Sequence, residues 1–231
     1  MNDLSESLLR TRHPRRTVLR AAAAAAVAAL LIAPAIASAQ EKKADPNKDY
    51  SAELMKPGSL PDLVLGKADA PVTIVEYASM TCSHCASFHN TVLPKLKEKY
   101  IDTGKARLIM REFPLDNLAA AASMLARCAG DGKSHELISA FFAKQDEWAF
   151  VQGSPIPAMF KIASEHGFTK ESFDKCLTDQ KLLEGITATR DKANKTFQVR
   201  STPTFFVNGK KLDRADDIQY FDKALEPLLK Q

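Results

Sequence analysis

The chain has 231 residues, of which 45% are hydrophobic, and its formal net charge is +4 at pH 7. Residues 1–39 hold five of the Lys and Arg residues and two of the Asp and Glu residues, so the rest of the chain carries a net charge of +1. A charge this small gives no indication of nucleic-acid binding. The roughly 190 residues that follow are enough for one compact domain with a modest insertion.

Residues 1–39 have the pattern of an export signal. The pair Arg15-Arg16 is followed by an alanine-rich apolar run over residues 21–36, and the segment ends in a small-residue cleavage pattern at Ala39. We therefore expect cleavage after Ala39. The twin arginines favour the Tat route, although a Sec signal can also carry two arginines. The alternative is a membrane anchor, but the run is short for a membrane span and Pro34 interrupts it.

The next part of the chain leads into a strand. Residues 40–61 are polar, contain proline and glycine, and are typical of a flexible leader. Residues 62–66 predict a short edge strand, and residues 67–71 predict a turn. Residues 72–77 are almost all β-branched, apolar or aromatic, which predicts a buried strand.

A pair of cysteines with CxxC spacing follows this strand. Thr81 stands where a helix N-cap would stand, so Cys82 and Cys85 are expected in the first turn of a helix. Unpaired backbone N–H groups and the helix macrodipole favour a thiolate there, and can lower a cysteine pKa from about 8.5 into the range of about 3.5–7.5. His84 adds a donor that favours the thiolate further when it is protonated. A thiolate of low pKa is a good leaving group, so the spacing predicts a strongly oxidising disulfide.

The alternative for these cysteines is a metal site. His89 follows Cys85 by one helical turn, so a Cys-Cys-His cluster is conceivable. Structural zinc commonly takes a second Cys or His pair at short spacing, whereas Cys128 and Cys176 are far apart. A strand followed by CxxC favours redox chemistry, and we expect neither a metal nor a cofactor.

Beyond the cysteines the sequence predicts a helix, a strand and then a wholly helical segment. The buried face of the first helix is expected to contain Phe88, Val92, Leu96 and Tyr100. Pro94 lies inside this helix and is expected to kink it. Residues 105–114 predict a strand parallel to residues 72–77, because a helix connects the two. Residues from about 115 to 198 form a helical subdomain inserted between two halves of a sheet domain.

The chain then returns to strand. Residues 204–207 predict a strand, Asn208-Gly209 predicts a two-residue hairpin turn, and residues 210–212 predict the return strand. A last helix is expected over about 215–230.

Cys128 and Cys176 are predicted to form a structural disulfide. Each lies on the apolar face of its predicted helix, and an exported chain meets an oxidising compartment. The alternative is two separate buried thiols that behave as small hydrophobic side chains.

This order of elements resembles the DsbA family of thioredoxin-fold proteins. The similarity covers about residues 60–231, and its specific motifs are Cys82-Ser83-His84-Cys85 and Ser201-Thr202-Pro203-Thr204. The resemblance implies an α/β protein with a thioredoxin-like fold over residues 62–231 and an inserted α-helical subdomain at about 115–198.

The resemblance also implies roles for single residues. Cys82 is expected to be the exposed nucleophile and Cys85 its buried partner, and Pro203 resembles the family's cis-proline, which faces the CxxC motif. The backbone of Thr202 can pair with an extended substrate. Glu76 matches an acidic residue of the family's central strand, where it could move the proton of Cys85. The alternative for Glu76 is a solvated carboxylate at the end of a strand.

The function implied by the resemblance is that of a periplasmic dithiol–disulfide oxidase. Such a protein passes its disulfide to reduced or unfolded exported proteins, and a membrane quinone-linked partner of the DsbB kind reoxidises it. Residues 40–61 are too short for the dimerisation domain of the related isomerases, which argues against an isomerase. We also expect a monomer.

Two residues depart from the best-known members. Ser83 replaces a proline and Thr202 replaces a valine, so an isomerase or reductase of the same fold is one alternative. A non-catalytic exported chaperone or metal-binding module is another. The intact Cys82–Cys85 pair and Pro203 favour catalysis, because binding alone needs neither thiol.

Overall fold

A five-stranded mixed sheet forms the centre of the part of the chain that this computed structural model describes, residues 48–130 and 132–230. The strand order is β1-β3-β2-β4-β5, with β2 and β3 parallel and the other pairs antiparallel. The strands are β1 (Leu63–Leu65), β2 (Val72–Ala78), β3 (Ala106–Glu112), β4 (Thr204–Val207) and β5 (Lys210–Lys211). The edge position of β1 and the parallel central pair confirm the predicted arrangement of these strands.

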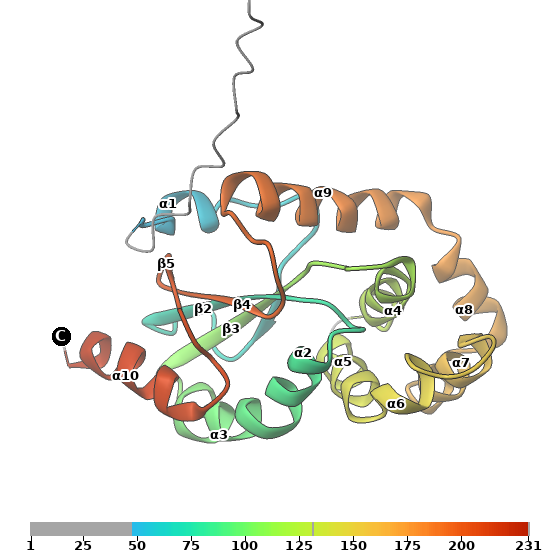
Figure 1. The fold of residues 1–231 in the computed structure, drawn as a ribbon, viewed down its shortest axis with the longest axis horizontal. Helices are drawn as coiled ribbons and strands as arrows, with labels where there is room; N and C mark the ends of the chain where they lie inside the picture. The colour runs from blue at the N-terminus through green and yellow to red at the C-terminus, as the bar shows by residue number, and fades with distance from the viewer. Residues whose placement is uncertain (1–47, 131, 231) are drawn as a thin grey trace, which may run out of the picture. The chain divides into compact units, whose positions relative to one another are not determined.

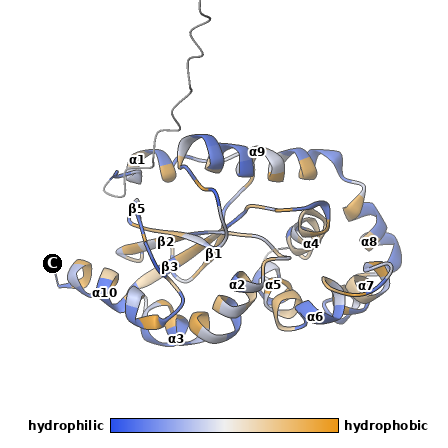
Figure 2. Ribbon diagram, in the orientation of Figure 1, coloured by the Kyte–Doolittle hydropathy of each residue, from blue (hydrophilic) through white to orange (hydrophobic). Residues whose placement is uncertain are grey.

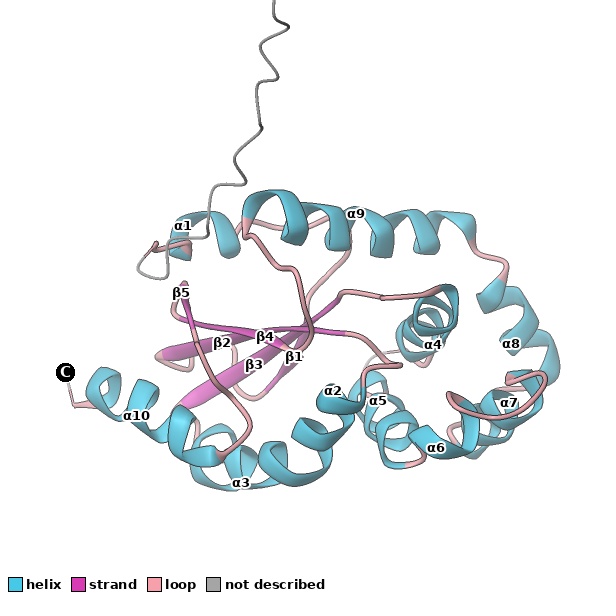
Figure 3. Cartoon of the chain, in the orientation of Figure 1, coloured by secondary structure: helices cyan, strands magenta, loops and turns pink. Residues whose placement is uncertain are grey.

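Helices cover the sheet and fill the connection between β3 and β4. Those around the sheet are α1 (Ser51–Leu54), α2 (Ser83–Ser87), α3 (Leu93–Leu96) and α10 (Ile218–Leu229), with π-helical turns η1 (Phe88–Val92) and η2 (Lys97–Ile101). Those of the insertion are α4 (Asn117–Cys128), α5 (Ser134–Ala143), α6 (Gln145–Trp148), α7 (Ile156–Glu165), α8 (Lys170–Leu177) and α9 (Gln180–Thr196). Figures 1 and 3 show the strands between α1 and α9 on one side and α3 and α10 on the other. The fold is thus thioredoxin-like with a helical insertion, as predicted.

The alternation of side chains along β2 decides which layer each one joins. Val72 and Ile74 pack with the helical segment after the cysteines and with α10, whereas Val75 and Tyr77 pack on the other face with α1 and the end of α9. Because side chains in a strand alternate between faces, Glu76 belongs to the face that carries α2 and η1. Figure 2 shows the hydrophobic colouring of β2 and β3 between these two helical layers.

The helix that follows the cysteines changes its hydrogen-bond pattern next to Pro94. A π-helical turn ends at Val92, and an α-helical turn begins at Leu93. The π turn η1 precedes α3, so Pro94 falls in the first turn of α3, a position where proline is common. The predicted buried face is preserved, because Phe88, Val92, Leu96 and Tyr100 are all at most 4% exposed.

Residues 48–54 of the predicted flexible leader pack against the sheet, so the prediction is wrong for them; residues 55–61 are irregular and mostly exposed, and residues 40–47 and the predicted export signal lie outside the described residues. Tyr50 and Leu54 are 5% and 1% exposed, and α1 connects them. The Tyr50 N–H donates to the Gly209 carbonyl at 2.9 Å, and its ring contacts those of Phe197 and Phe206 edge-on. Tyr50 and Leu54 belong to the hydrophobic cluster on one face of the sheet. Two apolar residues within a polar stretch do not form a pattern from which this packing could be predicted.

The turn between β4 and β5 requires a backbone conformation that glycine adopts easily. Asn208 and Gly209 both have positive φ, 43° and 86°, as a type I′ turn requires. A Cβ on Gly209 would lie 2.3 Å from the Ser51 nitrogen, so this position also lets α1 approach closely.

The helices of the insertion share one core with the end of β2, α2 and β3, and Phe141, Trp148 and Phe173 are fully buried in it. Cys128 and Cys176 are bonded through their sulfur atoms, with their Cα atoms 6.2 Å apart, and link α4 to α8. The expectation that both point inward is wrong for Cys128, which is exposed, while Cys176 is 4% exposed. Cys128 is the last residue of α4, where the helix reaches the surface.

Candidate active site

The cysteine pair lies where β2 gives way to α2. Cys82 is the N-cap residue, with an extended backbone, and Cys85 is fully buried in the first turn. The prediction of Thr81 as the N-cap is wrong by one residue. The Thr81 hydroxyl instead donates to the Asp116 carboxylate at 2.7 Å, and Asp116 caps α4 by accepting from the Ala119 N–H.

The surroundings of Cys82 stabilise a thiolate. A hydrogen bond from the Cys85 thiol is the main cause that lowers the pKa of Cys82 to about 5, against the opposing effect of burial. The Thr202 side chain and the backbone N–H groups of Cys85 and His84 add to this effect. The Thr202 hydroxyl is buried and has no other hydrogen-bond partner among the described residues. Cys82 is therefore equipped as a nucleophile and leaving group.

Cys85 has the opposite character. Burial raises the pKa of its thiol far above the ordinary value, and the neighbouring Cys82 and the charge of Glu76 raise it further. A thiolate formed on Cys85 is therefore unstable and takes up a proton.

The loop before β4 completes the entrance to the site. The peptide bond between Thr202 and Pro203 is cis, and the Cys82 thiol donates to the Thr202 carbonyl at 3.3 Å. His84, Phe88 and both loop residues line a groove of about 280 Å³ beside Cys82. The His84 side chain is exposed on this wall, and it is the backbone N–H of His84 that reaches the Cys82 sulfur. An additional effect of its imidazole stays a prediction.

Glu76 is fully buried, so the alternative of a solvated carboxylate is wrong. Both of its carboxylate oxygens lie within hydrogen-bond distance of His89 Nε2, at 3.2 and 3.0 Å. The sequence placed His89 on the Cys85 face of the helix, but it gave no sign of this partner. The described residues contain no group of three or more Cys, His, Asp or Glu side chains that could hold a metal ion.

Gln145 is a site residue that the sequence did not reveal. It opens α6 in the insertion, is 5% exposed, and its side-chain amide donates to the carbonyls of Met80 and Cys82 at 2.9 and 3.2 Å. The insertion thereby holds the loop that carries Cys82. A polar residue between two short helices carries no sequence signal for such a contact.

Comparisons with known proteins agree with this geometry. A family model described as thioredoxin matches residues 59–227. A putative protein-disulfide oxidoreductase of Rickettsia bellii is 42% identical over 64% of this chain and 57% of its own length. A probable disulfide bond formation protein D of Bacillus anthracis is 31% identical over 72% of this chain and 78% of its own length. The crystal structure of Wolbachia pipientis alpha-DsbA1 is 34% identical, covers 78% of this chain and 96% of its own, and superposes with a TM-score of 0.72.

The matches to the Rickettsia proteins cover only part of the length of those proteins. The chain spans less than two thirds of the length of the Rickettsia relatives that it matches, between 53% and 62%. None of the described helices is long and apolar enough to cross a membrane. The thioredoxin match, the structural similarity and the cysteine pair at the start of α2 lead to one assignment: the chain belongs to the thioredoxin family and, within it, to the DsbA type.

Proposed function

We propose that this chain is a protein dithiol–disulfide oxidoreductase that works as an oxidase, through a mixed disulfide on Cys82. The observation that carries the proposal is the opposite acidity of the two thiols. The pKa of Cys82 is lowered to about 5 at a partly exposed position, whereas that of the buried Cys85 is raised. A disulfide between such thiols is easily reduced, because the reduced form is stabilised by the Cys82 thiolate.

The reaction balances as two thiol–disulfide exchanges. A substrate thiolate attacks the Cys82 sulfur, the bond between the Cys82 and Cys85 sulfurs breaks, and Cys85 receives the electron pair and then a proton. A second substrate thiolate attacks the substrate sulfur of the mixed disulfide, and Cys82 leaves as a thiolate. The substrate dithiol is oxidised to a disulfide, and the cysteine pair is reduced by two electrons.

Glu76 is proposed to handle the proton of Cys85. It is fully buried, and its charge acts on the Cys85 thiol. A carboxyl group held beside a buried thiol can give that thiol a proton in one direction of the reaction and remove it in the other.

The substrates are proposed to be extended segments of reduced or unfolded exported proteins. Thr202 lines the groove beside Cys82, and the backbone of this residue can pair with an added strand. The names of the Rickettsia and Bacillus relatives refer to the same chemistry of disulfide formation.

The periplasm is the proposed location, with residues 1–39 as an export signal that is removed after Ala39. A membrane quinone-linked partner of the DsbB kind is the proposed oxidant that restores the disulfide. An oxidising compartment suits both the catalytic pair and the Cys128–Cys176 bond.

The test is the reduction potential together with activity on a dithiol peptide. We expect the pair, equilibrated against a glutathione series, to have a potential nearer about −120 mV than about −270 mV. We also expect the oxidised protein to convert a reduced dithiol peptide to its disulfide. A potential near the lower value would assign the protein as a reductase, and no reaction with the peptide would refute the proposal.

A further inference from the structure

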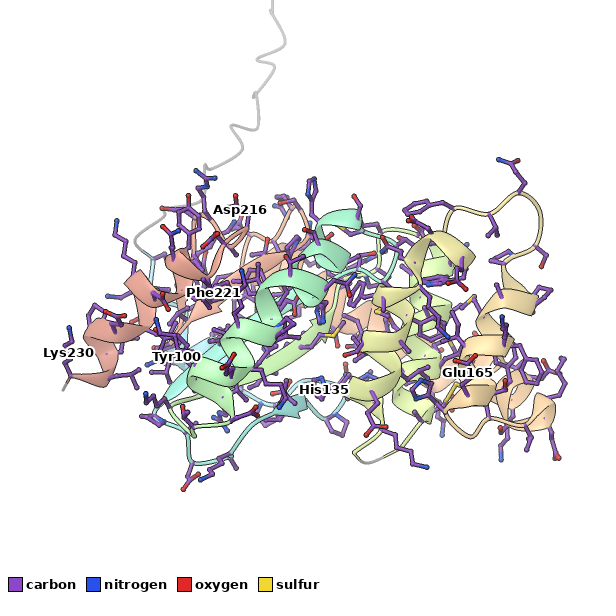
Figure 4. All side chains as sticks on the ribbon, turned by 90° about the horizontal axis from the view of Figure 1, so that it is seen from below. Tyr100, His135, Glu165, Asp216, Phe221 and Lys230 are labelled. Atoms are coloured by element: carbon purple, nitrogen blue, oxygen red, sulfur yellow. A yellow bond between two sulfur atoms is a disulfide. The ribbon has the colours of Figure 1, made fainter. Side chains whose placement is uncertain are left out.

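The groove beside Cys82 borders on a second hollow near the last helix. Asp213 and Arg214, in the loop before α10, line both the groove and this second pocket, which has a volume of about 440 Å³. Figure 4 labels Asp216, which lies in the same loop, and Phe221 within α10. Because the two hollows share part of their wall, an extended segment bound in the groove can reach from one into the other.

The second hollow is formed by the end of the sheet, the loop and one face of α10. We call it the lysine pocket, and the residues that β5, its end and α10 contribute to it are Lys211, Leu212, Tyr220, Lys223 and Ala224. The three residues from α10 are spaced by three and four positions, so they share one face of the helix. Phe221 fixes this helix, because it is fully buried and its ring lies 5.7 Å from that of Phe88 in the Cys82 groove. One packed helix thus supports both hollows.

Arg214, which lies between the groove and the lysine pocket, already has its partners. Its guanidinium group lies over the Tyr220 ring, 4.7 Å from the ring centroid. Two of its nitrogens contact the Asp216 carboxylate, at 3.2 and 2.9 Å, which makes the ion pair bidentate. Arg214 is therefore held as part of the wall.

Two other cations of the lysine pocket have no such partner. Neither Lys211 nor Lys223 forms an ion pair within the described part of the chain, and Lys211 is partly buried at the end of the sheet. Asp213 is the one carboxylate in the described lining. With Asp216 counted against Arg214, these five charged groups leave one positive charge uncompensated. The lysine pocket therefore suits a side chain that carries a carboxylate, and its aliphatic and aromatic side chains can pack against the hydrocarbon part of that side chain.

We propose that the lysine pocket is a specificity subsite for an acidic side chain of the substrate segment that reacts at Cys82. The inference deepens the proposed function and rests on it. A glutamate or aspartate of the bound segment places its carboxylate near the ammonium groups of Lys211 and Lys223, and this charge complementarity favours acidic segments over neutral and basic ones. Side chains of an extended segment alternate between two sides. The subsite therefore accepts an acid at one position, or at positions two residues apart, but not at neighbouring positions.

The test compares dithiol peptides that differ in one side chain. A neutral peptide with glutamines on both sides of its cysteine pair is compared with peptides in which one glutamine at a time is replaced by glutamate. At low ionic strength we expect the oxidised protein to react about fivefold faster when the glutamate stands at the matching position, which is the size of effect that exposed ion pairs give. Added salt should reduce this preference, because it screens exposed charges.

Matched variants locate the preference in the protein. Lys211→Gln combined with Lys223→Gln should abolish it, and Lys223→Gln alone, at an exposed position, serves if the double variant does not fold. Lys161→Gln combined with Lys230→Gln removes the same charge from exposed positions outside the pocket and should keep the preference. Replacement of both pocket lysines by arginine should also keep most of it. An equal preference in the pocket and control variants, or the same gain from glutamate at every position, would overturn the subsite.

The proposed function and the subsite fail in different ways. If the unchanged protein does not oxidise the neutral peptide, the proposed function is refuted. Fluorescence anisotropy with labelled peptides in which serine replaces both cysteines then still decides the subsite. Tighter binding of the glutamate peptide, which the glutamine variant of the pocket loses, supports the subsite, whereas equal binding of the glutamate and neutral peptides refutes it.

Discussion

The two cysteine pairs of this chain occupy opposite ends of helices. Cys82 caps the N-terminus of α2, whereas Cys128 is the last residue of α4 and Cys176 is the last residue but one of α8. The N-terminus of a helix favours a thiolate, and the C-terminus opposes it. Cys128 is nevertheless more exposed than Cys82. The position of a cysteine at one or the other end of a helix, together with its hydrogen bonds, therefore decides its reactivity more than its exposure to solvent does. Cys82 is suited to disulfide exchange, and Cys128 is suited to a stable disulfide.

The largest effect expected from this comparison is on activity. Cys82→Ser should abolish oxidation of a dithiol peptide, because it removes the attacking and leaving sulfur. Cys85→Ser should instead accumulate mixed disulfides on Cys82, as identified by mass spectrometry of trapped adducts. Adducts that form on Cys85 in Cys82→Ser, with none on Cys82 in Cys85→Ser, would reverse the assignment.

The second pair should affect stability and leave activity nearly intact. Replacing both Cys128 and Cys176 by serine opens a loop whose ends are 48 residues apart. The loop-entropy model gives a loss of up to about 4 kcal/mol in the free energy of unfolding. Denaturant unfolding measures this loss, and the dithiol-oxidation assay supplies the control. If the double variant is as stable as the unchanged protein, or if it folds but no longer oxidises the peptide, then the second pair does not have the purely stabilising role expected here.

A smaller effect should follow from the contact between the insertion and the loop that carries Cys82. Gln145→Ala leaves the carbonyls of Met80 and Cys82 without their side-chain donor, which should cost about 1–3 kcal/mol of stability. The rate of Cys82 alkylation should change as well, because the loop is no longer held. Gln152→Ala, at an exposed position, is the control. A variant as stable as this control, with an unchanged alkylation rate, would show that the contact is dispensable.

The smallest effect is a pH dependence that only the reduced protein should show. The pKa of Cys82 falls from 9.0 to about 5 on folding, so its thiolate adds stability that is fully present above pH 9 and is lost as the pH falls to about 5. The melting temperature of the reduced protein should therefore fall relative to that of the oxidised protein between those values. Solvent screening at the partly exposed Cys82 reduces the effect. Parallel melting curves across this range would contradict the low pKa.

Local patterns predicted much of the fold. The β-branched run of β2, the turn Asn208-Gly209 and the cysteines at a helix start are recognisable because a few adjacent residues determine each feature. The contacts of Glu76 with His89, and of Gln145 with the carbonyls of Met80 and Cys82, depend on residues that meet only in the tertiary structure. The packing of Tyr50 against the sheet was missed for the same reason.

The acidity of Cys82 has a consequence for how the folded state can be observed. The groups that lower its pKa come from α2 and from Thr202, which is 120 residues away in the sequence. An unfolded chain brings none of these groups together, so its thiols react at the ordinary, slow rate at acidic pH. Alkylation of Cys82 in mild acid thus labels only molecules in which these segments have joined. The same sulfur that is proposed to carry out the exchange can therefore serve as a built-in reporter of folding.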